Sequence, residues 1–305
     1  MRALLFLFLT LAFVHIHCQR ASKYLGQNPP GEVPQVFAPD LVSVKSRIEY
    51  GISFSPNGKE MAFGVLDIKD ESGRIYYSSW TSNKWTEPAV ASFLGNSSVY
   101  LPVFTPDGKS LLYTQSQYDS ANYITDIWMV NKRNNGWDKP FQLPEPINSS
   151  TREGSVCITS NQTFYFSSGR DCIGKTNCPA SIYSSRLIGG KYQTVEKETH
   201  LNIKGDNESI FVSADETFAI ISNVTKSTPN ANLYISFRTS NNQWSTLVKM
   251  DSTINTNDWE LRPFVTADNK YLFFTRMSFD ANVLKESDIY WVSMEGLLKS
   301  NGRAK

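Results

Sequence analysis

One short pattern occurs five times in this chain, and it limits the fold more than any other feature. Each copy contains an apolar residue, a Ser or Thr, a turn residue and an Asn or Asp. The copies are residues 54–58, 104–108, 158–161, 212–215 and 265–268. Their Ser or Thr positions lie 50, 54, 54 and 53 residues apart. A near-constant period of this length indicates a ring or stack of equal supersecondary units.

Each repeat has the pattern of short antiparallel strands. The Pro-Asn-Gly after Ser55 and the Pro-Asp-Gly after Thr105 predict turns, because proline presets φ, Asn and Asp bond the nearby backbone, and glycine accepts a positive φ. Short apolar runs on both sides of the turn predict buried strands. A third strand carries a pair such as Ile75-Tyr76, and a fourth carries an aromatic residue such as Trp137. Four short strands in about 50 residues predict one blade of a β-propeller.

The fold class that follows is an all-β, five-bladed β-propeller of four-stranded antiparallel blades. The last repeat ends soon after Tyr290 and lacks a fourth strand. Residues 34–42 resemble the fourth element of other repeats, including 137–143, so we expect this N-terminal segment to complete the last blade. Such closure removes free sheet edges. Six blades are the alternative, although the even spacing leaves no gap for a degenerate sixth.

Composition narrows the class of partner. The chain has 305 residues, 40% of them hydrophobic, and a formal net charge of +1 from 30 basic and 29 acidic residues. No arginine-rich run or basic patch is visible, so nucleic acid is not an expected partner. The repeat extends through nearly the whole chain, so we expect a single domain over residues 34–305, preceded by a polar tether at 19–33.

Residues 1–18 have the pattern of a signal peptide. Arg2 precedes an apolar run at 4–14, which is too short to span a bilayer. A retained buried or membrane-associated segment is the alternative. Cys18 lies where a bacterial lipoprotein carries its lipidated cysteine, with simple cleavage nearby as the other interpretation. We therefore expect an exported protein that is periplasmic, anchored to the outer membrane or secreted, and that contacts a membrane only through an N-terminal lipid.

The remaining cysteines predict no metal centre. Cys172 and Cys178 lie in one loop, where a local disulfide suits an exported protein. Cys157 falls in a predicted strand and reads as a small buried hydrophobic residue. The mature chain has one histidine, His200, and no clustered cysteines, so neither a zinc site nor a cofactor is expected.

Some of these motifs resemble the TolB-like, WD-related propeller repeats of exported bacterial proteins. The matching residues are Phe-Ser-Pro-Asn-Gly-Lys at 54–59, Phe-Thr-Pro-Asp-Gly-Lys at 104–109, Asp-Ile-Trp at 126–128 and Asp-Ile-Tyr at 288–290. Residues 24–31 and 37–39 are similar to the N-terminal signature of one exported subgroup. The resemblance covers about residues 24–293. It implies a propeller fold and an envelope location, and it implies no particular activity.

Glutamates near the start of each repeat are the candidate catalytic residues. Glu49, Glu153 and Glu260 each lie six residues before the Ser or Thr of their repeat, Glu208 lies five before its own, and Val99 occupies the slot in blade two. First strands line the channel of a propeller, so these carboxyls would converge and raise one another's pKa, as in glycoside hydrolysis. The alternative is a structural role repeated from blade to blade, which the periodic recurrence favours. A Ser-His-Asp site would depend on His200 alone.

Five loops between second and third strands are expected to gather on one face, at 67–73, 116–125, 169–179, 223–230 and 278–286. They carry aromatic and charged residues that suit recognition of sugars or peptides. The candidate binding residues are Tyr118, Asp119, Tyr123, Arg170, Asp171, Phe279 and Asp280. Ordinary solvated loops are the competing interpretation.

The function predicted from the sequence is non-enzymatic. We expect a binding or scaffold module for an envelope protein, a peptide or a glycan, which acts through the long-loop face or the channel mouth. The alternative is a glycoside hydrolase or lyase that uses Glu49, Glu153 and Glu260.

Overall fold

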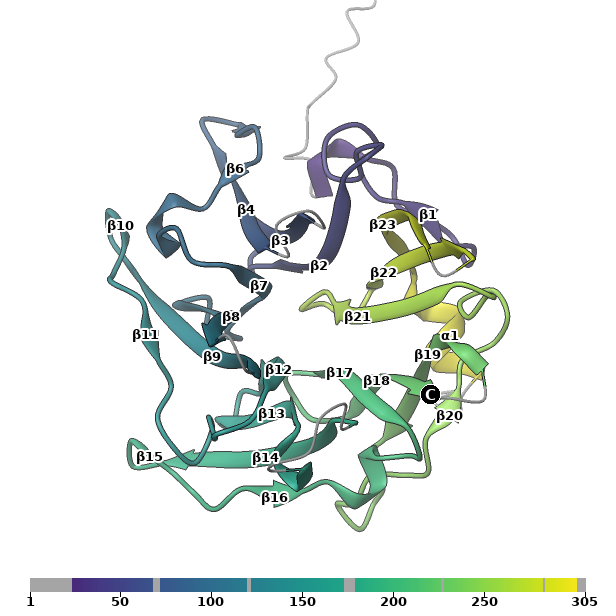
Figure 1. The fold of residues 1–305 in the computed structure, drawn as a ribbon. Coiled ribbons are helices and arrows are strands. Elements are labelled where there is room, and N and C mark those ends of the chain that lie inside the picture. Colours follow the sequence, from purple (N-terminus) through teal and green to yellow (C-terminus); the bar gives the residue numbers. More distant parts are fainter. Residues whose placement is uncertain are drawn as a thin grey trace, which may run out of the picture.

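The computed structural model describes residues 24–67, 72–119, 122–172, 179–225, 228–281 and 283–300, with only the backbone described at 117–119, 122–123, 228–229 and 299–300. The predicted signal peptide, most of the tether and Cys18 lie outside the described residues. The strands are arranged as a ring of sheets around a central axis (Figure 1). This all-β propeller confirms the predicted fold class.

The strand pairings form five antiparallel units, which correspond to the five repeats. The innermost strands are β2 (Ile48–Phe54), β7 (Val99–Phe104), β12 (Glu153–Ile158), β17 (Asp206–Val212) and β21 (Trp259–Val265). The second strands are β3 (Glu60–Asp67), β8 (Ser110–Asp119), β13 (Thr163–Ser168), β18 (Phe218–Thr225) and β22 (Tyr271–Asp280). The third strands are β4 (Ser72–Thr81), β9 (Asn122–Arg133), β14 (Ser181–Ile188), β19 (Thr228–Phe237) and β23 (Val283–Ser293).

The outer strands of the blades are only two residues long. They are β5 (Lys84–Trp85), β6 (Ala89–Val90), β10 (Gly136–Trp137), β11 (Phe141–Gln142), β15 (Lys191–Tyr192), β16 (Glu196–Lys197) and β20 (Val248–Lys249). Four 3₁₀ turns are η1 (Tyr24–Gly26), η2 (Ser92–Leu94), η3 (Arg170–Cys172) and η4 (Thr199–Leu201), and one helix, α1 (Met294–Ser300), follows β23. Among the described helices none has the length and apolar character needed to cross a membrane.

Hydrogen bonds within the turn explain the repeated sequence pattern. In blade one the Ser55 hydroxyl donates to the Asn57 amide oxygen (2.8 Å), which also accepts from the backbone N–H of Lys59 (2.9 Å). The Ser55 hydroxyl oxygen accepts from the N–H of Glu60 (2.9 Å). A Ser or Thr two residues before an Asn or Asp makes the same contact in every other blade. The residue after the Asn or Asp has a positive φ in all five copies, and glycine, at Gly58 and Gly108, adopts this without strain.

The N-terminal strand β1 (Gln35–Val36) pairs with β23, as the sequence predicted. Gln35 lies opposite Trp291 and Val36 lies opposite Tyr290, and the N–H of Phe37 donates to the carbonyl of Ile289 (2.7 Å). A single parallel bridge between Ile48 and Ser287 also joins β2 to β23. The last blade thus receives its fourth strand from the other end of the chain, and the ring is closed.

Packing of Phe37 fixes this closure. Its side chain is fully buried, and its ring lies 5.9 Å from that of Phe54, 5.1 Å from Phe273 and 5.3 Å from Trp291, centroid to centroid. These rings come from blades one and five, so the closing segment fills the space between the first and last blades.

We expect Phe37→Ala to lower the free energy of unfolding by about 3–5 kcal/mol, because it leaves a cavity between the first and last blades. Urea denaturation followed by tryptophan fluorescence measures the change. Leu41→Ala in the same segment is the control, since Leu41 is 38% exposed and should cost under about 0.5 kcal/mol. Equal losses in the two variants would contradict the assigned closure.

Candidate functional site

The two faces of the ring differ in which connections they carry. The pairing of Ile48 with Leu66 and of Asp67 with Ser72 places the start of an inner strand beside the turn between second and third strands. We call this the hairpin face. The inner strands end at the opposite face, which carries the five Ser/Thr–Asx turns and is called the turn face. The candidate catalytic and binding residues predicted from the sequence belong to the hairpin face.

The three candidate glutamates lie at the start of β2, β12 and β21, and all three side chains are fully buried. Each accepts a backbone N–H from the segment that leads into its strand: Val44 to Glu49 (3.3 Å), Ser149 to Glu153 (3.0 Å) and Thr256 to Glu260 (3.1 Å). Each also pairs with one arginine: Arg47 (2.6 Å), Arg170 (3.3 Å) and Arg276 (2.9 Å), respectively.

The arginines repeat a second set of contacts. Each donates to a backbone carbonyl of the same leading segment, at Val42 (2.5 Å), Ile147 (2.7 Å) and Ile254 (2.8 Å). Each guanidinium also lies 4.5–5.5 Å from the centroids of two aromatic rings, which stack on each other across the second and third strands. The ring pairs are Phe63 with Tyr76, Phe166 with Tyr183, and Phe274 with Tyr290. We call a glutamate with its arginine and two rings a Glu–Arg cassette.

Blades two and four fill the glutamate position differently. In blade four it is occupied by Asn207, which accepts from the N–H of Ile203 (3.3 Å) and donates to its carbonyl (3.0 Å). The sequence prediction grouped Glu208 with the three glutamates, although Asn207 is the residue that lies six positions before the Ser or Thr of its repeat, as those glutamates do. In blade two, Val99 lies opposite Gln115, as Glu260 lies opposite Arg276. The position therefore serves the local backbone in four blades.

Burial raises the pKa of all three cassette glutamates, and it raises the pKa of Glu49 to about 7. The side-chain partners of the three carboxyls come from their own blades, and among the described residues no hydrogen bond joins two of these carboxyls. A converging acid pair for glycoside hydrolysis thus stays a prediction. The contacts favour the structural interpretation, in which the carboxylate ties a leading segment to its blade.

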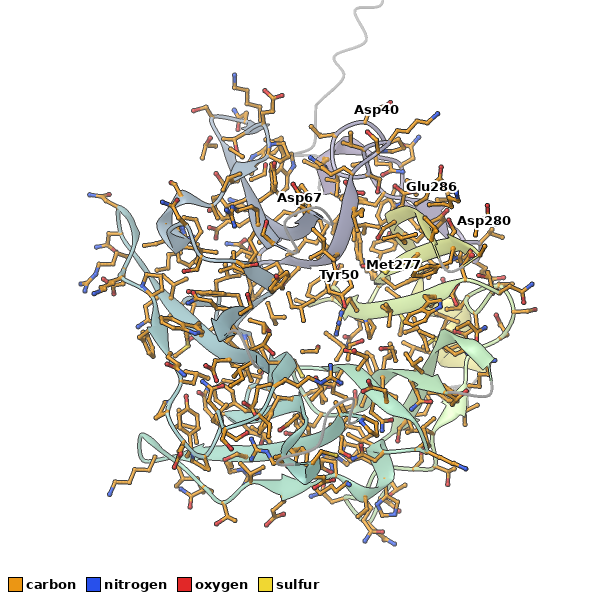
Figure 2. All side chains as sticks on the ribbon, in the orientation of Figure 1. Asp40, Tyr50, Asp67, Met277, Asp280 and Glu286 are labelled. Carbon is orange, nitrogen blue, oxygen red and sulfur yellow. The ribbon has the colours of Figure 1, made fainter. Side chains whose placement is uncertain are left out.

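A charged network lies toward the channel and joins four blades. Arg152 contacts Asp206 (3.0 Å) and Glu208 (3.3 Å), and Arg262 contacts the other oxygen of Glu208 (3.1 Å). Arg262 also donates to the hydroxyl of Tyr50, and its guanidinium lies 4.5 Å from the centroid of that ring. Figure 2 shows Tyr50 near the middle of the ring. We call these five residues the axial network.

In the axial network the positive charges of Arg152 and Arg262 are balanced by the negative charges of Asp206 and Glu208. Burial opposes ionisation of Glu208, yet the charges of Arg262 and Arg152 lower the pKa of its carboxyl. Burial and the charge of Glu208 raise the pKa of Asp206. Sequence reasoning missed this network, because its members occupy different positions in different repeats and so leave no periodic signal. It supplies both donors and acceptors to the hairpin face of the channel.

Four of the five predicted loops are strand hairpins instead. The β8–β9 pairing continues from Ser110 opposite Asn131 to Asp119 opposite Asn122, and β22–β23 continues to Asp280 opposite Val283. In segment 223–230 the described residues 223–225 and 228–230 lie in strands, and in segment 67–73 the described residues 67, 72 and 73 do. The sequence predicts loops where polar residues alternate with β-branched or aromatic residues, although such alternation also suits a two-stranded ribbon exposed on both sides. In blade three, η3 follows β13, and residues 173–178 are not described.

The predicted binding residues have separate surroundings. Arg170 belongs to a Glu–Arg cassette, and Asp171 accepts from the Tyr183 hydroxyl and pairs with Lys197 (2.5 Å). Tyr118 lies opposite Tyr123 in the β8–β9 ribbon, but the side chains of Tyr118, Asp119 and Tyr123 lie outside the described residues.

Phe279 and Asp280 lie at the end of the β22–β23 hairpin. Phe279 is 40% exposed, and its ring lies 5.3 Å from that of Trp259, centroid to centroid. Asp280 pairs with Lys285 (3.6 Å). Among the described side chains of the predicted set, Phe279 is therefore the exposed aromatic group, and Asp171 and Asp280 are exposed charged groups.

The cysteines agree with the chemistry expected of an exported chain. Cys172 is disulfide-bonded, and since Cys178 lies outside the described residues the pairing of the two stays a prediction. Cys157 is free and buried in β12, and burial raises its pKa to about 12. In the part of the chain that the structure describes, no group of three or more His, Cys, Asp or Glu residues is placed to hold a metal ion.

Comparison with solved structures identifies the fold. A putative TolB from Agrobacterium tumefaciens matches with a TM-score of 0.52 and 14% identity, over 82% of this chain and 78% of that chain. The catalytic domain of the Coprinopsis cinerea GH62 α-L-arabinofuranosidase matches with a TM-score of 0.49 and 12% identity, over 87% and 98%. An endo-arabinase from Bacteroides thetaiotaomicron matches with a TM-score of 0.48 and 14% identity, over 86% and 96%. No family model and no curated protein matches the chain. The match to the putative TolB supports the propeller fold, and at 14% identity the likeness extends to fold alone.

The cassette of blade five offers a direct test of its structural role. Arg276→Gln leaves Glu260 buried without its cation, so we expect a loss of about 3 kcal/mol in the free energy of unfolding. The double variant Glu260→Val/Arg276→Gln reproduces the Val99–Gln115 pair of blade two and should recover more than half of that loss. Urea denaturation measures both. A double variant no more stable than the single one would contradict the structural role.

Glu49 should make folding stability depend on pH. Between about pH 4.5 and pH 7 the folded state retains a proton on Glu49 that the unfolded chain has released, so stability falls as pH rises through this window. We expect Glu49→Gln to remove this fall, which amounts to at most about 3 kcal/mol. Urea denaturation between pH 4.5 and 8 measures it, with the exposed Glu87→Gln as the control for loss of one carboxylate. An unchanged slope in Glu49→Gln would contradict the assignment.

Proposed function

We propose that this chain is an exported, TolB-like propeller that binds an envelope protein, a peptide or a glycan through its hairpin face and catalyses no reaction. The observation that carries the proposal is the aromatic pair of Phe279 on Trp259 at the end of the β22–β23 hairpin. Phe279 keeps 40% of its surface exposed although it packs on another ring. An exposed ring held in one orientation by a second ring provides a stacking surface for a sugar ring or an apolar side chain.

Charged groups near this pair add polar recognition. Asp280 and Lys285 lie on the same hairpin as Phe279, and the ion pair between them is largely exposed. Toward the channel, the axial network presents arginine and carboxylate groups whose positions are fixed by their mutual contacts. A few fixed polar groups beside an aromatic surface are the usual composition of a binding site that selects its ligand by hydrogen bonds.

Export and TolB-like character are supported by the sequence and by the shared fold. The apolar run at residues 4–14 and the candidate lipidated Cys18 support export, and the likeness to a putative TolB supports an envelope role. Mass spectrometry of the membrane fraction tests acylation at Cys18. An unmodified N-terminus beyond Cys18 would leave a periplasmic or secreted protein.

Glycoside hydrolysis or lyase activity is the alternative. The raised pKa of Glu49 favours it, since a general acid needs a pKa near the working pH. Against it, each cassette carboxylate is fully buried and pairs with its own arginine. A substrate would have to displace those arginines before reaching an acid.

A glycan and peptide array tests the two functions together. We expect binding without turnover, and about tenfold weaker binding in Phe279→Ala, because roughly half of a buried phenylalanine surface is worth about 1.4 kcal/mol. Phe141→Ala, which removes an equally exposed ring from the outer strand β11, should bind like the wild type. Hydrolysis of an array hit that is lost in Glu49→Gln, Glu153→Gln or Glu260→Gln would establish the enzymatic alternative.

A further inference from the structure

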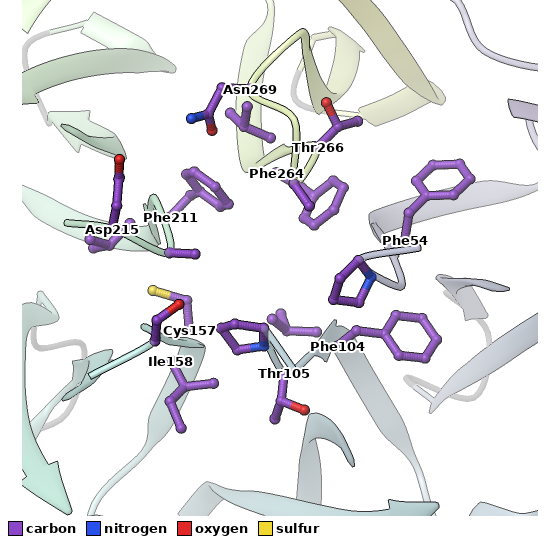
Figure 3. Close-up of a pocket in the computed structure, with 18 residues that line it drawn as sticks. Phe54, Phe104, Thr105, Cys157, Ile158, Phe211, Asp215, Phe264, Thr266 and Asn269 are labelled. Atoms are coloured by element: carbon purple, nitrogen blue, oxygen red, sulfur yellow. The ribbon is translucent and has the colours of Figure 1, made fainter. Parts of the chain in front are cut away.

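A cavity of about 310 Å³ opens on the turn face, at the opposite end of the axis from the hairpin face. The ends of all five inner strands line it, so it lies on the axis of the ring (Figure 3). The position follows from the repeat, because the apolar residues just before each Ser or Thr come to surround one point when five copies close into a ring. The volume is at the lower end of the range for small-molecule pockets.

The body of this axial cavity is apolar. Phe54, Phe104, Phe211 and Phe264 line it from four different blades, and Ile158 lines it from the fifth. The rings of Phe211 and Phe264 border its centre, whereas those of Phe54 and Phe104 turn outward (Figure 3). The rings of Phe211 and Phe264 meet edge to face, with centroids 6.0 Å apart. Binding of an apolar group to a cavity with this lining is favourable, because the group displaces water from apolar surface.

The rim of the cavity is open and is formed by residues with small side chains. Its lining includes one turn residue from each blade, at Pro56, Pro106, Ser160, Ala214 and Ala267. Ser160, Ala214 and Ala267 are exposed, and the N–H of Ser160 donates to the carbonyl of Ala214 (2.8 Å), which joins two neighbouring turns. Solvent and a small ligand therefore reach the cavity past side chains that need not move.

One charged group belongs to the lining of the cavity. Asp215 lies at its edge and is exposed (Figure 3). The hydroxyl of Ser213 and the N–H and hydroxyl of Thr217 all donate to Oδ1 of Asp215, at 2.8–3.1 Å. These three bonds leave Oδ2 accessible to solvent or to a ligand. Burial opposes its ionisation, but the bonds from Ser213 and Thr217 lower its pKa, so the carboxylate stays charged at neutral pH.

The repeat itself supplies the comparison that singles out Asp215. Asp107 and Asp268 occupy the same turn position in blades two and five and accept the same hydroxyl bond, yet neither lines the cavity. The Nζ of Lys270 lies 3.9 Å from Asp268. Only the blade-four copy therefore places an uncompensated negative charge beside the apolar lining.

From this combination we infer that the axial cavity binds a small amphiphilic cation, with an apolar body against the rings of Phe211 and Phe264 and a terminal ammonium group beside Oδ2 of Asp215. The ammonium supplies the donors that Oδ2 lacks, and a charged hydrogen bond is stronger than a neutral one. This ligand class is independent of the partner proposed for the hairpin face, since the two sites lie at opposite ends of the axis.

Isothermal titration calorimetry with 4-phenylbutylamine and its neutral isostere 4-phenylbutanol tests the inference. We expect saturable binding of both at low ionic strength, with the amine at least tenfold tighter. Asp215→Asn should lower the affinity for the amine to that of the alcohol and leave the alcohol unaffected. Asp107→Asn is the matched control, because it removes the same turn carboxylate away from the cavity and should preserve the tenfold preference.

A second variant locates the site without relying on the turn carboxylate. Ala214→Phe adds a ring at an exposed rim position and should abolish binding of both ligands while thermal unfolding stays within a few degrees of the wild type. Three results would overturn the inference: no saturable binding of the amine, equal affinity for amine and alcohol in the wild type, or unchanged binding in Ala214→Phe. A loss of the preference in Asp107→Asn equal to that in Asp215→Asn would also overturn it.

Discussion

The pairing of β1 with β23 is the contact on which the remaining architecture depends. It joins segments about 250 residues apart, and the hydroxyl of Ser43 adds a hydrogen bond from the N–H of Ile289 (3.1 Å) across the same junction. Without it β23 of the last blade would present an unpaired edge, and the segment that ties the first blade to the last would be free. The axial network, the axial cavity and the hairpin face all exist because the ring is closed.

Repetition separates structural residues from functional candidates in this molecule. The Ser/Thr–Asx turns and the Glu–Arg cassettes recur, and every recurrence makes the same contacts with its own blade. The place of Asp215 in the cavity lining, the ring contact of Phe279 and the ion pairs of the axial network have no counterpart in another blade. A buried charge that recurs three times with the same partners anchors a segment, whereas one that departs from the repeat needs a separate explanation.

The blades and the closure were predictable because they depend on local, periodic signals. The turn at Ser55 and the apolar runs beside it report on neighbouring residues, and the missing fourth strand of the last repeat indicated the role of residues 34–42. The axial network was not predictable, since Arg152, Glu208 and Arg262 come together only when three blades take their places in the ring. The hairpins were not predictable, because polar residues that alternate with β-branched or aromatic ones occur both in loops and in a ribbon exposed on both faces.

The contact between Arg262 and Tyr50 is a second interaction across the junction of the first and last blades. β1 closes that junction through the backbone of β23, while Arg262 of blade five reaches Tyr50 of blade one beside the axis. A mechanical load applied through an anchored N-terminus would act first on the buried ring of Tyr24, which packs on Phe54 and Trp291, and then on β1, which is only two residues long. Separation of β1 from β23 would leave the contact between Arg262 and Tyr50 in place, so the ring resists opening even when its closing strand has detached.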